Sequence, residues 1–235
     1  MLRTNFKRLS NIPWHGLLGW LFGNRLRILM YHSISENLRN PQTISTAEFK
    51  RQMASFQATH VISLAEGLEL LKENQSLKNT WVITFDDGLL DFYTTALPVL
   101  REFNYPVTVF IPTGLVGTNS KWDSYNKTKP LMTWKQLEGC QQWKVTFGSH
   151  TVNHTRLTEC GDDALMGELQ TSLHSLQNRL ERVIPALAYP GGYHDARVRQ
   201  AVHNAGYACA LGTSSRWGNG SESDLFQLRR QHITS

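Results

Sequence analysis

Short apolar runs alternate along the chain with longer segments in which apolar residues recur every three or four positions. The runs are rich in β-branched and aromatic residues, as is typical of buried strands. We predict strands at residues 27–32, 61–62, 81–85, 106–111, 144–147, 186–189 and 207–211, and a final extended piece at 226–230. Helical spacing predicts helices at residues 46–58, 63–73, 89–103, 133–139, 162–183 and 195–205.

Seven or eight strands that alternate with helices indicate an α/β protein with a parallel sheet. The pattern favours a (β/α) barrel over an open, doubly wound sheet. At 235 residues and 40% hydrophobic composition, the chain can bury one large core, so we expect a single domain. A long loop is expected at residues 113–130, where Gly, Asn, Ser, Lys and Thr predominate.

Charge and cysteine content narrow the class of protein. The net charge of +5 comes from 24 basic and 19 acidic residues. This balance is too even for a nucleic-acid-binding protein, so no nucleic-acid partner is expected. The three cysteines, Cys140, Cys160 and Cys209, are widely spaced and indicate neither a disulfide framework nor a metal knuckle. A reducing compartment is the simpler interpretation.

The first 24 residues form a segment distinct from the domain expected at 25–235. Basic residues precede an apolar stretch at 12–22 that is too short to span a bilayer and lacks a signal-peptide cleavage site. The segment is either an amphipathic element at a membrane surface or a helix packed on the domain. We expect a cytoplasmic protein, with peripheral contact to the inner face of the membrane as the alternative that this segment offers.

Polar residues that could act in catalysis or metal binding occur where predicted strands end. They are His32, the pair Asp86 and Asp87, the pair His150 and His154, and the turn Pro190-Gly191-Gly192. In a parallel barrel all strands end on one face, so these residues can converge there. Taken alone, the acid pair could be a solvated Asp-Gly turn, and the histidines could be ordinary surface residues.

The histidine spacing suits a metal site. His150 and His154 are four apart, so one helical turn would present both imidazoles on one side. Two histidines and a carboxylate form a ligand set typical of zinc hydrolases and of some other divalent ions. A metal bound to one aspartate leaves the other free to act as a base toward water, an arrangement suited to hydrolysing an amide or an ester.

Two motifs resemble a known family. Residues 84–88 (TFDDG) and 149–154 (SHTVNH) are similar to the first two motifs of the polysaccharide deacetylase family, the NodB-homology domain of carbohydrate esterase family 4. Residues 31–33 and 188–192 resemble stretches found in one branch of it. The resemblance implies a distorted (β/α)7 barrel that removes acetyl groups from sugar polymers. It also implies that Asp86 is the catalytic base and that Asp87, His150 and His154 bind a divalent metal, most often zinc.

The sequence departs from the family pattern in two places. The arginine that often precedes the proline of the third motif, and is thought to orient the base, is absent; Arg229 or Arg230 could substitute for it. The C-terminal Leu-x-x-His motif is one residue too long here, which could turn His232 to the opposite face of its strand. His232 and His32 are therefore competing candidates for the general acid, with water at the metal as a third.

The remaining predictions concern the substrate. Tyr189, Pro190 and Gly191 are expected to line the pocket, with a backbone N–H near the turn holding an oxyanion. Four aromatic side chains could stack on sugar rings or simply pack: Trp122, Tyr125, Trp134 and Trp217. We expect a metal-dependent hydrolase of the amide bond in N-acetylated sugars of a polysaccharide or its precursor. The alternatives are a carbohydrate-binding protein that keeps the metal site without catalysis, and a metal phosphoesterase, for which the extra ligands of a two-metal site are missing.

Overall fold

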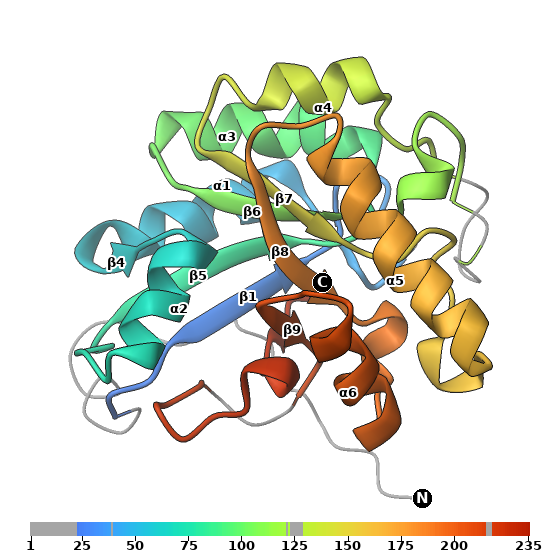
Figure 1. The fold of residues 1–235 in the computed structure, drawn as a ribbon. Coiled ribbons are helices and arrows are strands. Elements are labelled where there is room, and N and C mark those ends of the chain that lie inside the picture. Colours follow the sequence, from blue (N-terminus) through green and yellow to red (C-terminus); the bar gives the residue numbers. More distant parts are fainter. Residues whose placement is uncertain (1–22, 39, 121, 123–128, 215–217) are drawn as a thin grey trace, which may run out of the picture.

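The fold is built on a curled sheet of parallel strands with helices on its outside (Figure 1). This computed structural model describes residues 23–38, 40–120, 122, 129–214 and 218–235. The main sheet has the order β10-β1-β5-β6-β7-β8-β9, with β4 paired to β5. Its strands are β1 (Arg27–Tyr31), β4 (His60–Val61), β5 (Thr80–Phe85), β6 (Val107–Ile111), β7 (Val145–Ser149), β8 (Val183–Ala188), β9 (Cys209–Leu211) and β10 (Gln231–His232). A separate two-stranded sheet pairs β2 (Ser33–Ile34) with β3 (Thr43–Ile44).

The two edges of the curled sheet are joined by the segment that leads into β10. Leu211 forms a parallel bridge with Leu228, and the Gly212 N–H donates to the Leu228 carbonyl at 2.9 Å. The Ser214 N–H donates to the Arg230 carbonyl at 3.3 Å. Because β10 pairs with β1, the chain returns from the last strand to the first. The predicted distorted barrel, in a single domain, is confirmed.

Helices cover the outer face of the sheet. They are α1 (Thr46–Ser55), α2 (Leu64–Lys72), α3 (Leu97–Glu102), α4 (Trp134–Cys140), α5 (Asp162–Gln177) and α6 (Ala196–Asn204). Ser63 and Thr133 form capping boxes, which explains why α2 and α4 begin where they do. Among the described residues, no helix is both long enough and apolar enough to span a bilayer.

Several predicted boundaries are wrong. The helix expected at 162–183 ends at Gln177, and Val183 instead opens β8. Leu180 continues the helical spacing of buried leucines at 165, 169, 173 and 176, but it is buried in the connection that follows the helix. The helix expected at 89–103 is a π-helix (Phe92–Ala96) followed by α3. The extended piece expected at 226–230 begins within a 3₁₀ helix (Leu225–Gln227).

The central strands are buried along their whole length. Every residue of β1, β5 and β6 is buried, as expected for parallel strands that are covered on both faces. The strands therefore form a closed scaffold, and their carboxyl ends all lie on one side of it.

Residues 1–22 of the predicted N-terminal segment lie outside the described residues.

Candidate active site

The pairing of the strands determines which polar residues meet. Tyr31 pairs with Phe85, so the residues that follow them, His32 and Asp86, leave neighbouring strands at the same level. The Asp86 N–H continues the ladder by donating to the Tyr31 carbonyl at 3.0 Å. Strand β7 likewise ends level with β6, which brings His150 to the same face. The convergence expected at the strand ends is therefore observed.

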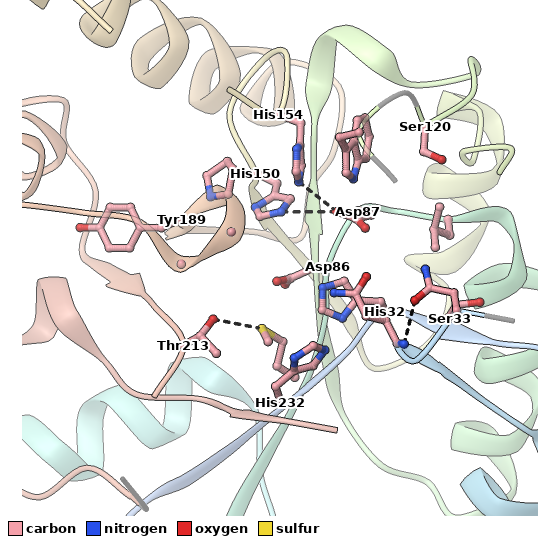
Figure 2. Close-up of a pocket in the computed structure, with 18 of the residues that line it drawn as sticks. His32, Ser33, Asp86, Asp87, Ser120, His150, His154, Tyr189, Thr213 and His232 are labelled. Atoms are coloured by element: carbon pink, nitrogen blue, oxygen red, sulfur yellow. Dashed lines mark hydrogen bonds and ion pairs between the residues drawn. The ribbon is translucent and has the colours of Figure 1, made fainter. Parts of the chain in front are cut away.

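These residues line a cavity of about 650 Å³. Figure 2 shows His150 and His154 on one side of Asp87, with Asp86, His32 and His232 on the other. The predicted pocket residues Tyr189, Pro190 and Gly191 also line it. The nine residues predicted as candidate catalytic residues, metal ligands or pocket residues thus line one cavity.

Asp87, His150 and His154 form a group that fits a divalent metal. One donor atom from each lies within 4.8 Å of the others, and both imidazole Nε2 atoms are 3.4 Å from Asp87 Oδ1. That oxygen is buried and has no hydrogen-bond partner among the described residues. The Ala188 carbonyl lies 2.7 Å from His150 Nδ1, which places the ring proton there and leaves the Nε2 lone pair free for a metal.

A tight loop, and not a helical turn, presents the two histidines. Thr151 and His154 have positive φ angles of 67° and 56°, which an α-helix does not contain. Glu168 holds the loop by accepting the N–H groups of Val152 and Asn153 at 2.8 and 3.0 Å. The two imidazoles do come together as the four-residue spacing predicted, but a loop brings them there and not the predicted helical turn.

Arg230 holds Asp86 through two charge-assisted hydrogen bonds. Its Nη1 and Nη2 donate to Oδ1 and Oδ2 at 2.6 and 2.7 Å, and both side chains are buried. Further bonds to Thr84 Oγ1 and the Gly212 carbonyl fix the guanidinium. Burial opposes ionisation of Asp86, but the charge and hydrogen bonds of Arg230, together with the nearby His150 and His32, outweigh it and lower the pKa of this carboxyl below its ordinary value. Of the two arginines considered, the structure selects Arg230.

His232 points into the cavity and lies against His32. Their ring centroids are 4.9 Å apart, and His32 Nδ1 and His232 Nε2 are buried without a partner among the described residues. The predicted displacement to the opposite face does not occur, because His232 and Arg230 are two residues apart and so share a face of the chain. Burial lowers the pKa of both imidazoles, and His32 helps to lower that of His232 to about 4.

A left-handed turn shapes one wall of the cavity. Gly191 has a φ of 64° inside the 3₁₀ helix Pro190–Gly192, a conformation that glycine adopts without strain. Tyr189 before it is buried and donates its hydroxyl to the Phe226 carbonyl at 2.9 Å. Tyr189 lines the cavity as expected, one residue after β8 ends at Ala188.

The aromatic residues proposed for sugar stacking divide into two groups. Trp122 lines the cavity, and its ring is parallel to that of His154 at a centroid distance of 4.0 Å. Trp134 packs against the core with Arg179 over its ring, which is the packing alternative. Tyr125 and Trp217 lie outside the described residues. Sequence reasoning missed several other lining residues, among them Lys129, Arg156 and Tyr193, for which the chain offers no motif.

Comparison with known proteins identifies the family. The model of the family "Polysaccharide deacetylase" matches residues 73–210, which is more than half of the chain. A Bacillus subtilis (strain 168) protein, YxkH, provisionally named a polysaccharide deacetylase, is 25% identical over 214 residues, covering 89% of this chain and 72% of its own. The Staphylococcus aureus poly-beta-1,6-N-acetyl-D-glucosamine N-deacetylase is 23% identical and covers 76% of this chain, which spans 63% of that enzyme's length.

Solved structures agree with this relationship. The Streptococcus pyogenes deacetylase PplD, solved in complex with acetate, superposes with a TM-score of 0.77 and 26% identity, covering 89% of this chain and 92% of its own. IcaB from Ammonifex degensii gives a TM-score of 0.79 at 21% identity and shares the fold, covering 90% and 93%. The chain belongs to the polysaccharide deacetylase family. The predicted family and the class of hydrolase, acting on a non-peptide carbon–nitrogen bond, are confirmed.

Proposed function

We propose that the protein removes the acetyl group from N-acetylated sugars of a polysaccharide or its precursor, with zinc bound by Asp87, His150 and His154. The observation that carries the proposal is the placement of this triad beside the Asp86–Arg230 pair in one cavity. A zinc ion in such a site acts as a Lewis acid toward the acetamide carbonyl and lowers the pKa of water. The chain's own residues supply the proton transfers.

Asp86 is suited to act as the general base. Arg230 keeps it ionised and aimed into the cavity, so its carboxylate can accept the proton of the attacking water. Arg230 itself acts through Asp86 and is a positioning residue. In the Pro190–Gly192 turn the proline has no N–H and the Gly192 N–H donates to the Tyr189 carbonyl at 2.8 Å, which leaves the Gly191 N–H as the candidate donor to the developing oxyanion.

His32 and His232 are the two candidates for the acid that protonates the leaving nitrogen. Each has a buried ring nitrogen that lacks a partner among the described residues, so each has a hydrogen-bonding position available. An amine leaves only after protonation, whereas p-nitrophenolate leaves without it. A His→Gln variant that loses amide hydrolysis but keeps p-nitrophenyl acetate hydrolysis therefore identifies the acid.

The central test is acetate release from N-acetylated oligosaccharides by zinc-loaded protein. We expect Asp86→Asn to abolish release while the metal content stays unchanged, because Asp86 is not one of the triad. Normal acetate release by Asp86→Asn would exclude this mechanism. A carbohydrate-binding protein without catalysis was an alternative suggested by the missing arginine and the displaced histidine. Arg230 and His232 both line the cavity, so neither a missing arginine nor a displaced histidine supports that alternative.

The cellular location is a separate proposal. The basic and apolar residues within 1–24 favour a cytoplasmic enzyme held at the inner face of the membrane, acting on a precursor. The test is to compare the membrane-bound fraction of the full chain with that of a chain lacking residues 1–24. Equal fractions would refute the membrane contact.

A further inference from the structure

The cavity wall carries more positive than negative charge. Among the described lining residues the carboxylates are Asp86 and Asp87, whereas the permanent cations are Lys129, Arg156 and Arg230. Arg230 is neutralised by its two bonds to Asp86. The two cations Lys129 and Arg156 then stand against the single negative charge of Asp87, and a divalent ion at the triad would add to this excess of positive charge.

Lys129 is held at the wall by neutral groups. Its Nζ donates to Ser33 Oγ at 2.9 Å and to Thr43 Oγ1 at 3.1 Å, and no described carboxylate lies within ion-pair distance. An ammonium has three N–H donors, so one remains after these two bonds. Ser33 donates onward to Asp91 Oδ2 at 2.5 Å, and Asp91 is not part of the cavity lining. Asp91 therefore interacts with Lys129 through Ser33, outside the cavity lining. Within the cavity, hydroxyl groups hold the Lys129 ammonium and no carboxylate neutralises it.

Arg156 supplies a second cation at the exposed end of the same cavity. Its guanidinium lies over the Tyr193 ring at 4.5 Å, and Nη1 is 3.3 Å from Glu159. All three side chains are exposed, so solvent screens this ion pair and leaves Arg156 able to interact with a ligand. Tyr193 follows the Pro190–Gly192 turn, which connects this cation to the catalytic wall.

We propose that the sugar substrate carries an anionic oxygen group, a phosphate or a carboxylate, which Lys129 binds next to the metal triad. This inference rests on the proposed deacetylation and specifies the class of sugar on which it acts. An ammonium fixed by two hydroxyls loses little freedom on binding an anion, and its remaining N–H can form a charge-assisted hydrogen bond. Arg156 adds longer-range attraction at the mouth of the cavity.

The experiment compares neutral and anionic sugars of the same core. Acetate release by zinc-loaded protein is measured with N-acetylglucosamine, its 1-phosphate, its 6-phosphate and N-acetylmuramic acid, which carries a carboxylate. We expect kcat/KM for at least one anionic sugar to exceed that for the neutral sugar by about tenfold, the effect of one charge-assisted hydrogen bond. The sugar that gains most separates a phosphate from a carboxylate ligand. The preference should decrease as salt is raised.

Variants test whether Lys129 is responsible. Lys129→Met should bring the anionic-to-neutral ratio of kcat/KM close to one, and Lys129→Arg should keep most of it. Lys135→Met makes the same charge change on exposed α4, outside the cavity, and should leave the ratio as in the wild type. Equal kcat/KM for all four sugars in the wild type, or a ratio that Lys129→Met does not change, would overturn the proposal.

A binding measurement separates this inference from the proposed function. Metal-free protein is titrated with glucosamine 6-phosphate, muramic acid and glucosamine, which cannot be deacetylated. Tighter binding of an anionic sugar by the wild type, lost in Lys129→Met and kept in Lys135→Met, supports the anion site even where no acetate is released. Absence of acetate release from every sugar would count against the proposed function alone.

Discussion

Replacing Arg230 by methionine should destabilise the fold and impair the catalytic base together. The side chain of Arg230 is 1% exposed and that of Asp86 4% exposed, so the change leaves a carboxylate in a site from which water is excluded. Breaking a buried ion pair by removing one partner typically costs about 3–5 kcal/mol. The two short hydrogen bonds, at about 1.5–3 kcal/mol each for bonds to charged groups, sum to about 3–6 kcal/mol, which overlaps that range.

Urea denaturation of the metal-free protein measures this cost. The matched control is Arg229→Met, which removes the neighbouring arginine, a half-buried residue that does not contact Asp86, and should cost less than about 1 kcal/mol. Combining Arg230→Met with Asp86→Asn should recover part of the loss, since the uncompensated charge is gone. The reasoning fails if Arg230→Met costs no more than Arg229→Met, or if the double variant is less stable than Arg230→Met alone.

Activity provides a second measurement on the same variant. Without the guanidinium, the strongest influence that opposes burial is lost, and the pKa of Asp86 rises. The acidic limb of the kcat/KM profile for acetate release should therefore move to higher pH in Arg230→Met. An unshifted limb would show that Arg230 does not determine the ionisation of the base.

Three further predictions concern other parts of the molecule. His154→Ala should lower the zinc content of dialysed protein, measured by mass spectrometry, whereas His174→Ala on the exposed face of α5 should not. Burial raises the pKa of Asp91 from 3.8 to about 6, so the folded state favours the protonated form. Stability measured by urea denaturation should fall by up to about 3 kcal/mol between pH 4 and pH 7, a decrease that Asp91→Asn should abolish. Gly148→Ala should cost at least about 1–3 kcal/mol in the same assay, because its Cβ would lie 2.5 Å from Phe110.

Local sequence patterns determined the elements and the chemical types in the site. Apolar runs located the strands because parallel strands are buried on both faces, and the residues at their ends were identifiable as His32, Asp86 and His150. The helix starts predicted at residues 63 and 133 coincide with the N-cap residues of α2 and α4. The family resemblance then assigned different roles to the two adjacent carboxylates.

Tertiary structure alone decided what each carboxylate faces. Arg230 is 144 residues from Asp86 along the chain, and only the return of the last strand to β1 makes them partners. His232 is two residues after Arg230 on the same extended segment, so its side chain also points into the cavity. The spacing of the Leu-x-x-His motif had left this orientation open. Ser33, Lys129 and Thr43 likewise meet through connections that no local pattern encodes. Spacing along a chain specifies local geometry, whereas contacts between distant segments follow from how the sheet closes and which charges remain buried.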